Sequence, residues 1–138
     1  MKTKWSLLAL LLFVVAAGLA LAGTEIYKPY NGRSGYQDIK LDPLNFVVIY
    51  STPIEGRGHF RILVNPEPYN FYRCAELAVS EGYPTFLVKN TAKSITDSYY
   101  TVSRTIELST APKALNNPQA FDARMVLQAM DLQINPRR

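Results

Sequence analysis

The chain has 138 residues, of which 48% are apolar and 19% charged, with 15 basic and 11 acidic side chains. This composition is typical of one globular domain and excludes a disordered charged tail and a protein with several membrane spans. A single cysteine excludes a structural disulfide, and a single histidine excludes a histidine-rich metal site. We therefore expect no metal, no cofactor and no disulfide.

Residues 1–22 have the pattern of a secretory signal peptide. Lys2 and Lys4 form a short basic start, an uncharged apolar stretch follows, and Ala20-Leu21-Ala22 puts small residues where signal peptidase requires them. We expect cleavage after Ala22 and a periplasmic or secreted protein. The alternative is an uncleaved anchor in the inner membrane, because the apolar stretch nearly reaches the roughly 20 residues of a spanning helix. Membrane contact is expected only in that case.

The charges that remain after cleavage are scattered. Because Lys2 and Lys4 leave with the signal, 13 of the 15 basic residues remain against 11 acidic ones. Nucleic-acid binding usually needs a basic stripe, and the sequence has none. We expect no nucleic-acid partner.

The part after the signal divides into an arm and a domain. Residues 23–43 are rich in Tyr, Gly, Asn and Pro and lack a sustained period, which predicts an extended arm laid over the rest. Residues 44–138 then form a single α+β domain. Short runs of β-branched and aromatic residues predict its strands, at 46–51, 60–64, 85–89 and 98–108. The last of these loses its alternation, which predicts a bulge near Arg104.

Two helices are expected. Asn65 is a suitable N-cap, with prolines and Glu67 in the first turn, and Gly82 ends the helix after Glu81. Residues 121–134 fit both the helical period and the strand period, and their Ala, Met, Leu and Gln content favours a helix.

This order of elements predicts the fold class. It is α+β, a two-layer sandwich with an antiparallel-rich sheet of about four strands. One main helix packs on one face of that sheet, and a short helix follows at the C-terminus.

Three short motifs resemble those of a known family. Gly35-Tyr36-Gln37-Asp38, Arg73-Cys74-Ala75-Glu76-Leu77 and Phe121-Asp122-Ala123-Arg124 are similar to motifs of small exported bacterial proteins, often lipoproteins, of unassigned function. The resemblance covers most of the chain from Tyr30 to Leu127 and implies an α+β envelope domain. The chain differs from many members because it lacks the lipobox cysteine, and because Pro53 to Asn65 replaces a shorter Gly-Asn turn.

Four polar residues are candidates for one cluster. Arg73 and Glu76 lie three apart on the main helix, close enough for an ion pair. With Asp38 or Arg124 they would either receive a ligand or tether the segment around Asp38 to the helix. The tether is the interpretation that the sequence favours.

Tyrosine is the most unusual feature of the composition, with nine residues in all. Tyr27, Tyr30 and Tyr36 crowd the predicted arm. A tyrosine combines a flat apolar ring with a hydroxyl, so an exposed group of them suits recognition of a protein or a glycan. The rings could equally fasten the arm to the sheet, and we favour that reading.

No catalytic residues are expected. Cys74 lies on the apolar face of its helix without an evident base, which is typical of a small buried side chain. Gly56 to His59 could present an anion-binding turn, although an exposed loop is the simpler interpretation.

The sequence therefore predicts an exported, non-enzymatic domain that interacts with a protein of the bacterial envelope. The alternative is a periplasmic module that binds a small ligand or glycan through the tyrosine-rich arm.

Overall fold

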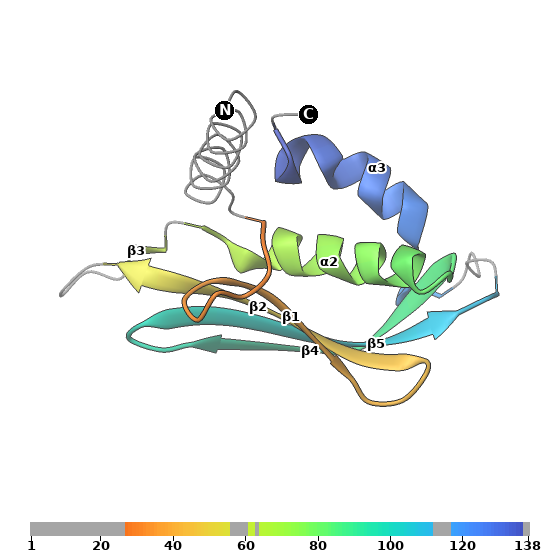
Figure 1. Ribbon diagram of the computed structural model, residues 1–138, viewed down its shortest axis with the longest axis horizontal. Helices are drawn as coiled ribbons and strands as arrows, with labels where there is room; N and C mark the ends of the chain where they lie inside the picture. The colour runs from red at the N-terminus through yellow and green to blue at the C-terminus, as the bar shows by residue number, and fades with distance from the viewer. Residues whose placement is uncertain (1–26, 56–60, 63, 112–116, 137–138) are drawn as a thin grey trace, which may run out of the picture.

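The computed structural model describes residues 27–55, 61–62, 64–111 and 117–136 (Figure 1). The helices and strands follow in this order: β1 (Gly35–Lys40), β2 (Asn45–Glu55), β3 (Arg61–Ile62), α2 (Pro66–Ser80), β4 (Thr85–Ile95), β5 (Tyr99–Ser109), β6 (Ala120–Asp122) and α3 (Ala123–Ile134).

The strands form one antiparallel sheet in the order β1-β2-β5-β4-β6, and the short β3 pairs with β2. Helix α2 lies along one face of the sheet, and α3 packs against α2 (Figure 1). The fold class is thus the predicted one, α+β with a main helix on one face and a C-terminal helix. The described residues contain no helix that is long and apolar enough to cross a membrane.

The sheet gains two strands over the sequence prediction. Residues 35–40, expected within the extended arm, form edge strand β1 and pair with β2 from Gly35↔Ser51 to Lys40↔Phe46. Most of β1 is exposed, so it lacks the apolar run by which strands are recognised. Gly35 is required at its start, because its φ is +120° and a Cβ would lie 2.4 Å from the Lys28 carbonyl oxygen. The other addition is β6.

Strand β4 is longer than predicted. Residues 90–95, which follow the strand predicted at 85–89, extend it to Ile95, and the turn to β5 closes where the Thr96 N–H donates to the Tyr99 carbonyl (2.9 Å). The bulge predicted in β5 near Arg104 is wrong, because the irregularity lies in the neighbouring strand. The register shift lies in β4 between Val88 and Asn90.

Helix α2 has the expected ends. The Asn65 side chain accepts the Glu67 N–H at 3.1 Å, and α2 ends before Gly82, whose φ is +85°. The C-terminal segment, whose pattern fitted both a strand and a helix, forms a short strand followed by a helix. Residues 120–122 pair with β4, and the Asp122 side chain then caps α3 by accepting the Met125 N–H (3.0 Å).

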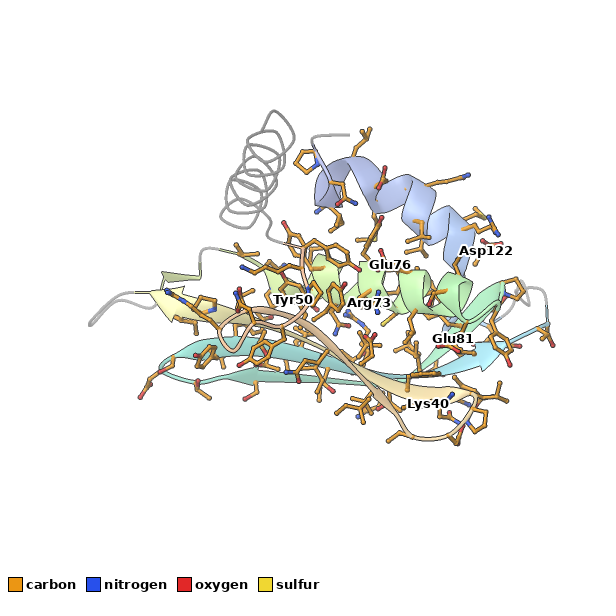
Figure 2. All side chains as sticks on the ribbon, viewed as in Figure 1. Lys40, Tyr50, Arg73, Glu76, Glu81 and Asp122 are labelled. Atoms are coloured by element: carbon orange, nitrogen blue, oxygen red, sulfur yellow. The ribbon has the colours of Figure 1, made fainter. Side chains whose placement is uncertain are left out.

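The core lies between α2 and the sheet. Alternate residues of β2 point into it, and Tyr50 (labelled in Figure 2) is completely buried. Its ring is stacked on that of Tyr69 of α2. The buried residues that pack together are Phe46, Val48, Cys74, Ala75, Leu77, Ala78, Phe86, Ile106, Leu108 and Ala123.

Candidate functional site

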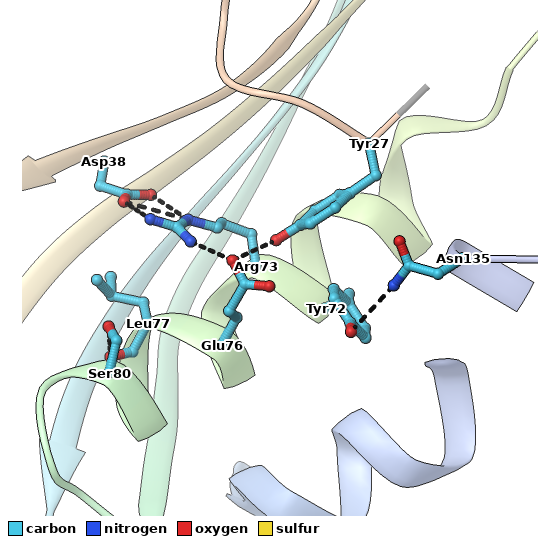
Figure 3. A network of polar contacts seen from close by, with 8 residues as sticks. All are labelled: Tyr27, Asp38, Tyr72, Arg73, Glu76, Leu77, Ser80 and Asn135. Carbon is cyan, nitrogen blue, oxygen red and sulfur yellow. Dashed lines mark hydrogen bonds and ion pairs between the residues drawn. The ribbon is translucent and has the colours of Figure 1, made fainter. Parts of the chain in front are cut away.

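Three of the four predicted cluster residues meet between β1 and α2 (Figure 3). The Nε of Arg73 donates to Asp38 Oδ1 at 3.1 Å, and its Nη2 pairs with the second carboxylate oxygen. Its Nη1 pairs with Glu76 one turn further along α2. The Tyr27 hydroxyl donates to the same carboxylate at 3.1 Å (Figure 3). A forked guanidinium thus joins the edge strand, the helix and the N-terminal chain.

Two of the three predicted arm tyrosines pack around this network. The Arg73 guanidinium lies 4.2 Å from the centre of the Tyr36 ring, and the Tyr27 ring lies 5.0 Å from that ring. Tyr72 of α2 meets Tyr27 edge-on at 5.0 Å. The rings therefore fasten the chain before β1 onto α2.

Tyr72 also connects α2 to α3, a role that sequence analysis missed. Its hydroxyl donates to Asp131 (3.1 Å) and accepts from the Asn135 side chain (3.2 Å; Figure 3). No spacing within the sequence signals this, because the partners lie about sixty residues away.

Tyr30 and Arg124 stand apart from the cluster. The Tyr30 side chain is exposed, while its backbone N–H donates to the Tyr36 carbonyl (2.9 Å). Arg124 is exposed on the first turn of α3 and forms no hydrogen bond or ion pair with the residues that the structure describes. Of the predicted set, Asp38, Arg73 and Glu76 form one cluster.

Tyr27 and Arg73 of this network keep their protons at neutral pH. Burial raises the pKa of the Tyr27 hydroxyl, and the Glu76 carboxylate raises it further. Burial alone would lower the pKa of Arg73, but the hydrogen bonds and charge of Asp38 outweigh it and raise that pKa. Neither group changes charge near neutral pH, which fits a tether.

Replacing Arg73 with alanine should lower the free energy of unfolding by about 2 kcal/mol. The change leaves two half-buried carboxylates without their cation and removes the guanidinium from the Tyr36 ring. Urea denaturation measures the effect. Arg124→Ala is the matched control and should cost under about 0.5 kcal/mol. Equal effects of the two changes would contradict the tether.

A second polar cluster lies beneath α2. Asn70 is completely buried, and its Nδ2 donates to the carbonyls of Val48 (2.8 Å) on β2 and Val102 (3.0 Å) on β5. Its Oδ1 accepts from Nη1 of Arg104 at 2.7 Å. All its hydrogen-bonding groups are thereby satisfied, as a buried amide requires. The only sign of this cluster in the sequence was a polar residue, Asn70, on the apolar face of the predicted helix.

Cys74 is completely buried beside Asn70, as the sequence predicted. Burial raises the pKa of its thiol from 9.0 to about 12. Its thiol does not form the thiolate that a nucleophile needs at neutral pH. The predicted loop of Gly56 to His59 lies outside the described residues.

The buried thiol predicts a loss of stability in alkali. The unfolded thiol ionises above its ordinary pKa while the folded one keeps its proton until about pH 12, so rising pH favours unfolding. Between about pH 8 and pH 10 we expect the native sequence to lose about 1 kcal/mol more stability than Cys74→Ala does. Urea titrations at both pH values measure it. Rapid modification of the native thiol by a disulfide reagent would contradict the burial.

The far half of β4 forms an open edge of the sheet. β6 pairs with β4 only from Thr85 to Leu87, and no described strand lies beside the rest of that edge. The last seven residues of β4, from Lys89 to Ile95, are exposed. We call the segment from Asn90 to Ile95 the β4 edge.

The hydrogen-bond ladder shows which backbone groups face outward. The Leu108 N–H donates to the Leu44 carbonyl (2.8 Å), so even-numbered residues of β5 direct their backbone groups to β2. The backbone N–H and carbonyl groups of the β4 residues paired with them must then point away from β5. These partners are Thr91, Lys93 and Ile95. Each leaves an N–H and a carbonyl at the β4 edge.

At one end of the β4 edge, between α2 and the sheet, is an open pocket of about 450 Å³. Its lining residues are Phe71, Val88, Lys89, Asn90, Thr91, Arg104, Pro118, Gln119 and Phe121. In the described part of the chain, no group of three or more His, Cys, Asp or Glu side chains could hold a metal ion.

Comparisons with known proteins add no relative. No protein-family model matches the chain, and neither curated proteins nor solved structures gave a match. The resemblance to exported envelope proteins stays a prediction from its three motifs.

Proposed function

We propose that this protein is an exported, non-enzymatic domain of the bacterial envelope that binds a protein partner along the β4 edge. An extended segment of the partner would add to the sheet as a further strand and pair with the outward backbone groups of Thr91, Lys93 and Ile95. The signal-type residues 1–22 support the export part of the proposal.

The open β4 edge is the observation that carries this proposal. Exposed edges normally carry features that prevent pairing, such as proline or outward charges. The β4 edge has no proline, and its one charged side chain, Lys93, is held by Glu67 of α2 at 2.6 Å. The edge therefore leaves its backbone accessible to an incoming strand.

The opposite edge of the sheet is protected differently. Pro29 forms a bridge with Tyr36, and Tyr36 donates its N–H to the Lys28 carbonyl (2.9 Å), so the chain before β1 covers the start of that strand. Because Tyr27 and Tyr36 are packed into the tether, they offer little free ring surface. The geometry therefore favours a protein partner over glycan binding by the tyrosine-rich arm.

Photo-crosslinking in the producing bacterium tests the proposal. A benzophenone amino acid replaces Ser94, which is exposed on the β4 edge, or Gln128, which is exposed on α3. We expect one reproducible envelope protein crosslinked from position 94 and none from position 128. The same products from both positions, or crosslinks only to other copies of this chain, would contradict the proposal.

A further inference from the structure

The pocket described above lies where the β4 edge meets β6. Its apolar lining includes Phe71 of α2, Val88 of β4 and Phe121 of β6. The two phenylalanine rings meet edge-on with their centres 4.8 Å apart. A pocket of this size and lining accepts one apolar side chain with room for a polar group beside it.

Arg104 supplies a positive charge to the pocket. Its side chain is only 13% exposed, and its Nη1 donates to Asn70 Oδ1 (2.7 Å) and to the Glu67 carbonyl (3.3 Å). Its Nη2 is 3.9 Å from Glu67 Oε1, an oxygen that Lys93 already binds at 2.6 Å. The buried cation therefore shares its nearest described carboxylate, Glu67, with Lys93.

The charges around the pocket leave one positive charge in excess. Lys93 is paired with Glu67, and Lys89 is paired with Glu107 at 3.1 Å. Among the described ion pairs, three cations, Lys89, Lys93 and Arg104, thus share the two carboxylates Glu67 and Glu107. Because a buried guanidinium is stabilised most by a carboxylate, a single carboxylate in the pocket would complete the set.

A partner strand added along the β4 edge could extend only as far as this pocket. The Val88 N–H already donates to the Gln119 carbonyl (2.9 Å), so the loop before β6 occupies the edge from there on. A segment that follows the β4 edge from Ile95 toward Val88 must therefore stop or turn away beside Arg104.

We infer, on the basis of the proposed function, that the partner segment runs antiparallel to β4 and ends in this pocket with its free C-terminal carboxylate. The carboxylate pairs with Arg104, and an apolar last side chain lies against Phe71 and Phe121. A segment of the opposite direction would bring its N-terminal ammonium to Arg104 and Lys89, where like charges repel. Electrostatic complementarity thus favours a segment that runs antiparallel to β4 and places its C-terminus in the pocket.

Fluorescence anisotropy with a defined probe tests this inference. The probe is a fluorescein-labelled Thr-Val-Thr-Val-Thr-Phe peptide, whose valines and phenylalanine share the face turned toward α2. The peptide with a free C-terminus should bind roughly tenfold more tightly than its C-terminal amide. Arg104→Gln should weaken the acid to the level of the amide, while the affinity for the amide stays the same. Urea denaturation confirms that the variant is folded.

The outcomes separate this inference from the proposed function. Equal affinity of acid and amide, with both lost in Thr91→Pro, would overturn the carboxylate site and leave the edge as the docking surface. No binding of either peptide at about 1 mM would overturn both. Tighter binding of the acid that persists in Arg104→Gln would also overturn the assignment of the carboxylate to Arg104.

Discussion

Replacing Asn70 with alanine should lower the free energy of unfolding by about 3 kcal/mol. The change removes two bonds to the carbonyls of Val48 and Val102 and the acceptor of the Arg104 guanidinium. A hydrogen bond to a charged group contributes about 1.5–3 kcal/mol and a neutral one about 1 kcal/mol. Since Asn70 is completely buried, water cannot replace the lost partners without opening the core. Urea denaturation measures the change.

A double-mutant cycle identifies the cause of that loss. If the bond to Arg104 dominates, Asn70→Ala and Arg104→Ala together should cost about 1–2 kcal/mol less than the sum of the single changes. Gln128→Ala, which truncates an exposed amide of α3, should cost under about 0.5 kcal/mol. Additive effects of the first two changes would show that Asn70 and Arg104 act independently.

Replacing Thr91 with proline should abolish the crosslink from position 94 while the domain stays folded. Thr91 points its N–H away from β5, so proline removes a donor of the β4 edge without breaking a bond inside the sheet. An incoming strand loses that hydrogen bond and meets the proline ring. The yield of crosslinked partner measures the effect, and urea denaturation checks the fold.

Thr91→Ala is the matched control for this substitution. It removes the same side chain but keeps the backbone N–H, so the crosslink should persist at close to its original yield. Loss of the crosslink in both variants would assign binding to the Thr91 side chain. An undiminished crosslink in folded Thr91→Pro would place the partner away from the β4 edge.

The helices were predictable because their signals are local. Asn65, Pro66 and Gly82 mark the two ends of α2 within the sequence itself, and the structure confirms them. Strand β1 was missed because it is a mostly exposed edge strand that depends on pairing with β2. The far half of β4 was missed for the same reason, since residues 90–95 are mostly polar and form a strand only against β5.

The two polar clusters also differ in whether a local spacing in the sequence reveals them. Arg73 and Glu76 were found because their spacing on one helix turn is visible in the sequence, and Asp38 was joined to them as a tether. The contact between Asn70 and Arg104 depends on how β5 is aligned under α2, which no spacing encodes. Arg124 was named with Asp38 as a possible member of the cluster, but the structure leaves it exposed on α3.

Amide hydrogen exchange along β4 tests the central claim most directly, because it needs no partner. The outward amides of Thr91 and Lys93 should exchange about a hundredfold faster than those of Ala92 and Ser94, which face Ser103 and Thr101 of β5. This alternation would establish a backbone edge that is free to receive a strand. Equal protection of all four amides would show that the edge is already covered and would contradict the account.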